Sequence, residues 1–194
     1  MSASRRGFLA ASGVAALALA ACGGDTDRET PERGPASGDL DILNFALVLE
    51  YFEEDFYRQV LENDIVSSAN RRLIRQIHRH ERRHVAALEA AADKLGTAAS
   101  PPQTSFEDVF GAGEGRTLRT ALDFENTGAA AYLGQANKVR SNAILADALS
   151  IHTVEARHAA AIADVTGATY LPDGAFATPL EPPQVMARIR PYIV

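Results

Sequence analysis

Apolar residues recur every three to four positions over four long stretches of this chain. That spacing places them on one side of an α-helix, so each stretch predicts an amphipathic helix with one buried face. Asp39 is the expected N-cap of the first helix, and Gly96 and Gly167 are expected to stop the second and the fourth. The predicted helices cover residues 39–62, 68–95, 114–138 and 141–166.

The connections between these stretches predict how the helices are arranged. Only a few residues join the first helix to the second and the third to the fourth, so each pair should form an antiparallel hairpin. The segment 96–115 is long enough, at ~3.3 Å per residue, to cross a helix of about 37 Å. It contains Pro101-Pro102 and an expected short turn at 106–110. The predicted fold is therefore all-α: a four-helix bundle of two antiparallel hairpins joined by one long crossover.

Composition agrees with helices and limits the partners. Hydrophobic residues make up 46% of the 194 residues, and the β-branched and aromatic runs typical of strands are scarce. The net charge is −6, and about −8 without Arg5 and Arg6, so nucleic acid is not an expected partner. Cys22 is the only cysteine, which excludes an internal disulfide.

The first 22 residues are typical of an export signal and are expected to lie outside the fold. Ser4-Arg5-Arg6-Gly7-Phe8-Leu9 resembles a twin-arginine signal, and an apolar stretch at 14–21 follows it. Leu19-Ala20-Ala21-Cys22 resembles a bacterial lipobox, in which the cysteine is acylated and becomes the mature N-terminus. The alternative is an ordinary secretory signal that carries two arginines, with Cys22 an incidental thiol. Residues 23–38 are expected to form a flexible tether to the membrane lipid anchor.

Charged residues interrupt the apolar stripe near the middle of each predicted helix. The second and fourth helices carry Glu-x-x-His at residues 81–84 and 155–158, which puts a carboxylate and an imidazole on one helix face. Glu50 and Glu125 lie on the inward faces of the first and third helices. Four buried carboxylates would repel one another, whereas two divalent cations would neutralise them. The expected metal ligands are Glu50, Glu81, His84, Glu125, Glu155 and His158.

The donor types indicate which metals would bind. Carboxylates with imidazoles suit a pair of iron or manganese ions, and they also suit zinc. Tyr57 and Tyr132 each follow an inward glutamate by seven residues. They are candidates for a redox-active residue, or for core tyrosines with a hydrogen-bonded hydroxyl. The alternative to metal binding is an inherited bundle that has lost its metal, with its glutamates held by water and arginine.

The two predicted hairpins repeat each other. Glu50 and Glu125 are 75 residues apart, and the two Glu-x-x-His motifs are 74 residues apart. These intervals predict a duplicated hairpin related by a pseudo-twofold axis. The same register selects Glu50 over Glu53 and Glu54, because neither has a counterpart in the third helix. Gly128 and the alanines around it are expected to serve close helix packing.

With its two hairpins and two Glu-x-x-His motifs, the segment 41–167 resembles the ferritin-like superfamily. Residues 41–51 and 131–134 are similar to the branch that includes desiccation-related proteins. The resemblance implies a ferritin-like four-helix bundle whose two metal ions are bridged by Glu81 and Glu155.

The residue before each Glu-x-x-His motif separates the candidate activities. Some di-iron enzymes carry aspartate there, whereas this chain has His80 and Val154, which argues against monooxygenase-type activation of oxygen. Residues 80–84 also match His-Glu-x-x-His, the zinc-protease motif in which two histidines bind zinc and the glutamate is the general base. The extended protease motif needs glycine and histidine where Ala87 and Ala90 stand, and it leaves the second Glu-x-x-His without a role.

Together these patterns predict an exported, membrane-tethered protein of the cell envelope with a di-metal carboxylate site. Its expected chemistry is metal binding with oxidoreductase activity on Fe(II), oxygen or peroxide. The alternative is a non-catalytic, stress-related protein of the cell envelope, and both a monomer and a homodimer remain open. The tail, residues 168–194, is expected to cap the bundle and to contain a short helix at 184–190.

Overall fold

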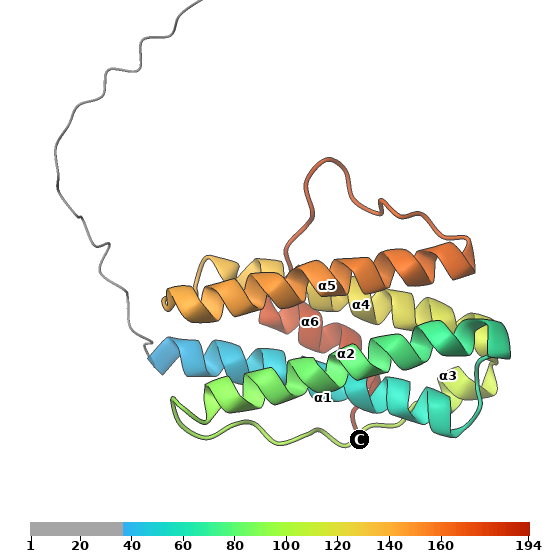
Figure 1. Cartoon of the computed structure of the whole chain (residues 1–194), viewed down its shortest axis with the longest axis horizontal. Coiled ribbons are helices and arrows are strands. Elements are labelled where there is room, and N and C mark those ends of the chain that lie inside the picture. Colours follow the sequence, from blue (N-terminus) through green and yellow to red (C-terminus); the bar gives the residue numbers. More distant parts are fainter. Residues whose placement is uncertain (1–36) are drawn as a thin grey trace, which may run out of the picture. The chain divides into compact units, whose positions relative to one another are not determined.

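The structure, a computed structural model, describes residues 37–194, so the expected signal, Cys22 and most of the tether lie outside the described residues. Helices dominate the described part, which confirms the all-α prediction (Figure 1). The long helices are α1 (Ser37–Glu62), α2 (Ser68–Ala92), α4 (Glu114–Ala136) and α5 (Asn142–Thr166). The shorter elements are α3 (Glu107–Gly111), α6 (Pro182–Ile189) and the 3-10 helix η1 (Arg190–Tyr192).

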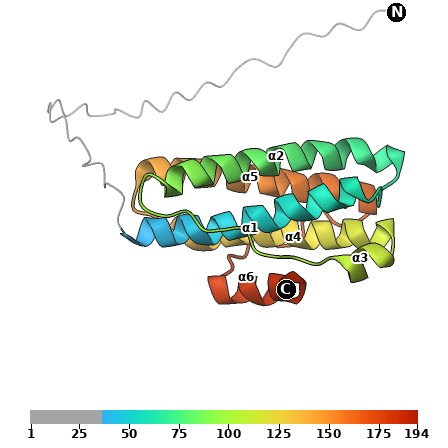
Figure 2. The ribbon, with the colours of Figure 1, turned by 90° about the horizontal axis from the view of Figure 1, so that it is seen from below.

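The long helices form a bundle of two hairpins. α1 packs against α2 in one antiparallel hairpin, and α4 packs against α5 in the other (Figure 1). The segment between α2 and α4 runs from one end of the bundle to the other and contains α3 near its far end (Figure 2). The predicted crossover is therefore confirmed. Because the four long helices run side by side, residues in the middle of each meet inside the bundle.

The helix ends follow the sequence signals, with two corrections. All four long helices begin and end within three residues of the predicted bounds. Gly96 does not stop α2, which ends at Ala92 with Asp93 as its C-cap. Asp39 is not the N-cap of α1, because α1 begins at Ser37. The Asp39 side chain is buried and accepts the backbone N–H groups of Arg140 and Ser141, both at 2.9 Å, which ties the start of α1 to the start of α5. Gly167 ends α5 as predicted, with the left-handed φ of 70° that favours glycine.

Two apolar clusters fill the bundle on either side of its middle. One cluster is built around phenylalanines that pack edge to face, with ring centroids 4.8–5.3 Å apart. These are Phe52, Phe56, Phe106 and Phe124. The other cluster includes Leu43, Leu47, Leu88, Tyr132 and Ile151. The middle of α1 lies between the two clusters and carries buried glutamates instead of apolar residues.

The C-terminal segment packs along α4, where α6 adds two buried apolar side chains to the phenylalanine cluster (Figure 2). The backbone N–H of Leu180 donates to Ala130 O at 3.0 Å. At Gly134 an added Cβ would be only 2.1 Å from Leu180 O. Glycine at this position therefore allows the tail to lie directly on the backbone of α4.

Candidate metal centre

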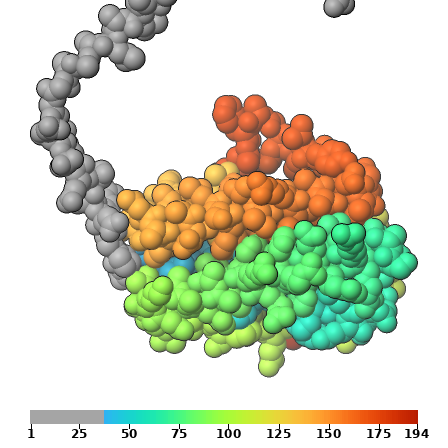
Figure 3. Space-filling view, in the orientation of Figure 1, coloured from blue at the N-terminus to red at the C-terminus, as the bar shows by residue number. Residues whose placement is uncertain are grey.

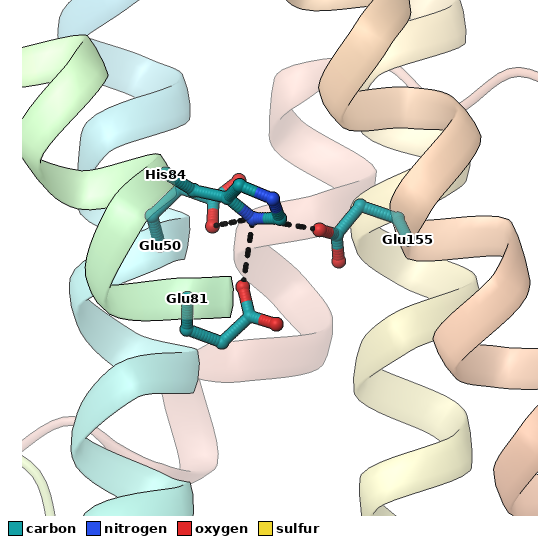
Figure 4. A group of neighbouring side chains, drawn as sticks. All are labelled: Glu50, Glu81, His84 and Glu155. Carbon is teal, nitrogen blue, oxygen red and sulfur yellow. Dashed lines mark hydrogen bonds and ion pairs between the residues drawn. The ribbon is translucent and has the colours of Figure 1, made fainter. Parts of the chain in front are cut away.

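The middle of the bundle holds buried carboxylates and imidazoles from all four long helices. They form two overlapping groups, in each of which the ligand atoms lie within 4.8 Å of one another. The first group is Glu50, Glu81, His84 and Glu155 (Figure 4), and the second is Glu81, Glu125, Glu155 and His158. The structure thus brings together all six residues that the repeat predicts as ligands.

His84 lies at the centre of the first group (Figure 4). Its Nδ1 is 3.2 Å from Glu50 Oε2 and 3.0 Å from Glu81 Oε2. Glu155, from the opposite hairpin, brings its Oε1 to 3.0 Å of the same nitrogen. One N–H cannot serve three carboxylates, so this corner of the site has more acceptor oxygens than protons to satisfy them. A cation beside Nδ1 would use all of these oxygens.

His158 repeats this arrangement in the second group. Its Nδ1 is 3.2 Å from Glu125 Oε2 and 3.0 Å from Glu81 Oε1. The matching distances around the two histidines are those that a pseudo-twofold relation between the hairpins produces. Glu155 departs from the symmetry, with its Oε1 4.0 Å from His158 Nδ1. Glu81 and Glu155 belong to both groups, so each lies where a carboxylate could bridge two ions.

The two tyrosines that the repeat aligns each reach across to the opposite hairpin. Tyr57 on α1 donates its hydroxyl hydrogen to Glu125 on α4, and Tyr132 on α4 donates to Glu50 on α1 at 2.5 Å. The hydroxyls therefore hold the outer carboxylate of each group in place. Burial, together with the neighbouring carboxylate, raises the pKa of both phenols well above its usual value, so both remain donors at neutral pH.

Glu53 is a further buried acid beside the site, although it belongs to neither of the two donor groups found among the described residues. It is 4% exposed and lies beside Glu155. An added Cβ on Gly128 would be 3.0 Å from Glu53 Oε1 and 3.4 Å from Glu155 Oε2. Gly128 therefore makes room for two carboxylates, which corrects the prediction that it serves helix packing. Glu53 and Gly128 occupy equivalent positions in the repeat, and this pairing of a large residue with glycine was the available signal.

His80 and Val154, the residues before the two motifs, make the halves of the site unequal. His80 Nδ1 lies 2.8 Å from His158 Nε2, and the centroids of the two rings are 5.1 Å apart. The pKa of His158 is raised to about 9 and that of His80 is lowered by burial, so His158 is the protonated ring and its Nε2–H donates to His80 Nδ1. Val154 cannot give His84 such a partner. His80 belongs to neither group of ligand atoms found among residues 37–194, so His80 and His84 do not form the zinc-protease arrangement there.

The carboxylates strongly favour protonation of the imidazoles in the metal-free chain. Burial alone would lower the pKa of His84, but hydrogen bonds to Glu50 and Glu81 outweigh burial and raise the pKa to about 10. Burial likewise opposes protonation of His158, but the hydrogen bond to Glu125 and the adjacent carboxylate of Glu81 raise its pKa to about 9. Both imidazoles therefore carry a positive charge at neutral pH when no metal is bound.

Several acids of the site are poorly satisfied by the protein alone. Burial raises the pKa of Glu53, Glu125 and Glu155, and the neighbouring carboxylates raise it further in Glu53 and Glu155. Buried oxygens of Glu53, Glu81 and Glu155 have no hydrogen-bond partner, since the 3.0 Å contacts of Glu81 Oε1 and Glu155 Oε1 with the imidazoles lack hydrogen-bond geometry. Unpaired oxygens on the two shared acids, Glu81 and Glu155, are what a pair of metal ions would satisfy, so the donor set fits such a pair.

The comparison with known families agrees with the fold and the donor set. The sequence profile of the ferritin-like domain matches residues 38–168. The chain belongs to the ferritin-like domain family. In ferritin-like di-iron and di-manganese bundles, two helices each provide a glutamate and the other two each provide a Glu-x-x-His motif. In this ferritin-like protein, α1 and α4 carry the glutamates, and α2 and α5 carry the Glu-x-x-His motifs. A comparison with curated proteins found no match.

Proposed function

We propose that this ferritin-like protein binds two iron or manganese ions between its hairpins and acts as an oxidoreductase on Fe(II), oxygen or peroxide. The pair of shared acids carries the proposal. Glu81 and Glu155 belong to both donor groups, and each has a buried oxygen without a hydrogen-bond partner. Each ion would also take one imidazole and one outer glutamate, which completes two equivalent ligand sets.

The charge balance of the site supports a redox-active pair. Five buried acids face one another, and two divalent ions with neutral imidazoles bring four positive charges. Glu53, whose pKa is raised, would stay protonated beside two divalent ions. Beside two more highly charged, oxidised ions it would lose this proton, and its negative charge would balance theirs. When bound, two iron or manganese ions supply the electrons that reduce oxygen or peroxide. Zinc would fill the same donors without redox chemistry and is therefore a useful control.

The chain's own residues would hold and isolate the metals. Tyr57 and Tyr132 fix the outer carboxylates through their hydroxyl hydrogens, and this contact is also what makes them candidates for a redox-active tyrosine. The apolar clusters on either side of the site keep bulk water away, which strengthens the attraction between carboxylates and cations. His80 fixes His158 with its Nδ1 toward the carboxylates.

We further propose that the protein is exported to the cell envelope and anchored to a membrane through a lipid on Cys22. The twin-arginine-like and lipobox-like residues in 1–22 support this location. None of the described helices is both long and apolar enough to cross a membrane. The similarity of residues 41–51 and 131–134 to desiccation-related proteins supports a role under stress, and the negative net charge argues against nucleic acid as a partner.

The test is anaerobic loading with Fe(II), followed by oxygen or peroxide while iron oxidation is monitored by absorbance. The native chain is expected to bind two iron ions and to oxidise them faster than free Fe(II) is oxidised in the same buffer. Glu155→Gln should bind at most one ion and lose the activity. Glu62→Gln, which changes an exposed acid on α1, should alter neither. Two bound ions without oxidation would refute the oxidoreductase activity, and no bound ion would refute metal binding as well. Either result would leave the non-catalytic envelope protein as the function.

A further inference from the structure

The outward side of α2 carries more positive charge than the chain itself pairs. α2 contains six arginines, whereas its acids are Glu81, which is fully buried, and Glu89, which is hydrogen-bonded to a tyrosine of α1. Arg71 forms an ion pair with Asp64, and Arg82 lines a hollow against α1 that contains two acids. Four arginines remain without such a neighbour.

These four arginines lie in a row along α2 and are called the basic ridge. They are Arg72, Arg75, Arg79 and Arg83, and a spacing of three or four residues keeps them on one side of the helix. All four are exposed, and none forms an ion pair with another residue of 37–194. At 1.5 Å per residue the ridge is about 16 Å long. In the space-filling view α2, in green, lies at the surface with its outer side uncovered (Figure 3).

The stability of α2 does not explain the ridge. Arg75 and Arg79 are four residues apart, and so are Arg79 and Arg83, a spacing at which like charges repel and destabilise a helix. No exposed acid between them on α2 offsets the repulsion. A row of like charges that opposes its own helix points to a partner outside the chain, and that partner must be anionic.

The charges elsewhere on the chain restrict the form of this partner. On α5, which lies beside α2 in one layer of the bundle, the exposed charged residues are Arg157, Asp147 and Asp164, so arginines outnumber acids in this layer (Figure 2). The whole chain has a net charge of −6, which would repel a polyanion that wraps around it. A flat anionic surface against α2 avoids this repulsion, because α1 and α4 lie a helix diameter of about 10 Å further away, beyond the screening length of about 8 Å.

We propose that the basic ridge binds the anionic headgroups of a phospholipid membrane, with the layer of α2 and α5 lying against the membrane surface. The guanidinium N–H groups would donate to phosphate oxygens of the headgroups. The inference deepens the proposed anchoring at Cys22, because it names a second contact with the same membrane and the side of the bundle that makes it. It does not involve the metal centre.

The test measures binding of the full chain to vesicles by co-sedimentation, with Cys22→Ser present throughout so that no lipid is attached. Vesicles of phosphatidylcholine are compared with vesicles of equal parts phosphatidylcholine and phosphatidylglycerol. Arg75→Gln with Arg79→Gln removes half of the ridge. The matched control, Arg116→Gln with Arg119→Gln, removes two exposed arginines of α4, in the other layer. Both double variants have a net charge of −8 instead of −6, and both keep residues 1–22.

The chain with the intact ridge is expected to bind the mixed vesicles more tightly than phosphatidylcholine alone, and added salt should weaken this binding. The ridge variant should bind the mixed vesicles about 25-fold more weakly, about fivefold for each arginine, and the control less than about twofold more weakly. The melting temperature of the ridge variant should equal or exceed that of the chain with the intact ridge, because the change removes repulsion within α2.

Equal binding with and without the ridge substitutions, or equal weakening by the ridge variant and the control, would overturn the proposal. So would a DNA oligonucleotide that binds through the ridge while the vesicles do not bind, because the ridge would then serve another polyanion. No lipid is attached in these measurements, so a negative result refutes the ridge contact and leaves the anchor at Cys22 to be tested by its own acylation.

Discussion

Metal binding to this site should release protons, because the metal-free chain holds them on the ligands themselves. The pKa values of His84 and His158 are about 10 and about 9. Both imidazoles are therefore protonated at pH 7, whereas a metal-binding ring nitrogen must be free of hydrogen. Loading both ions at pH 7 should thus release at least two protons per chain. Any proton that the buried acids hold before metal binding adds to that number.

The same count sets how the affinity varies with pH. Each released proton makes the apparent binding constant rise about tenfold per pH unit, so two protons give on the order of 100-fold per unit. The dependence should hold from about pH 7 to pH 9 and weaken above that, as first His158 and then His84 lose its proton in the metal-free chain.

The assay is calorimetric titration with Mn(II) in buffers of similar pH but different ionisation enthalpy. The observed heat varies linearly with the buffer enthalpy, and the slope is the number of protons released. His84→Asn should lower the slope and lose one ion. His78→Asn is the matched control, because His78 lies on the same helix but pairs with Glu54 outside the donor groups. A slope of zero in the native chain would refute the protonation argument, even if two ions bind.

Three further predictions concern the stability of the chain. The metal-free protein should be less stable at pH 9 than at pH 6.5 by on the order of 5 kcal/mol in urea unfolding. His84 and His158 have folded pKa values of about 10 and about 9, above the unfolded 6.5, so their stabilisation is lost as the pH rises through these values. A flat profile would contradict this. Phe52→Ala should lower the unfolding free energy by about 3–5 kcal/mol, because Phe52 is fully buried among aromatic rings. Phe176→Ala, at a side chain that is 88% exposed, should change it by less than ~0.5 kcal/mol. Gly167→Ala should lower the unfolding free energy by about 1 kcal/mol, because the φ of Gly167 is +70°. Gly174→Ala, in open space without a positive φ, should leave it nearly unchanged. Equal effects of the two substitutions would show that the backbone conformation of Gly167 is not the cause.

The fold and six members of the site could be predicted because they depend on periodicity along the chain. Apolar spacing defines each helix face, and a glutamate in the middle of such a face must lie inside the bundle. The repeat then aligns Glu50 with Glu125 and one Glu-x-x-His motif with the other, without knowledge of any contact. The structure brings these residues together, with nearly equal distances around both histidines.

The features that sequence reasoning missed are those where the two hairpins differ. Glu53 was set aside because a symmetric site has no place for it, yet Gly128 in the equivalent position leaves the space that Glu53 fills. His80 contacts His158 across the bundle, 78 residues away, and no local pattern marks that contact. Asp39 resembles an N-cap in its own helix, but its acceptor oxygens are used by backbone N–H groups about a hundred residues later. Such long-range partners depend on how the hairpins dock, which periodicity does not determine.

The central claim is that the shared acids Glu81 and Glu155 hold two metal ions between the hairpins. The most direct measurement is an anomalous difference map from crystals of the native chain grown with manganese or iron. We expect two peaks about 3.5–4 Å apart, one beside His84 and one beside His158, with both acids between them. A single peak, or well-ordered glutamates with no peak, would contradict it.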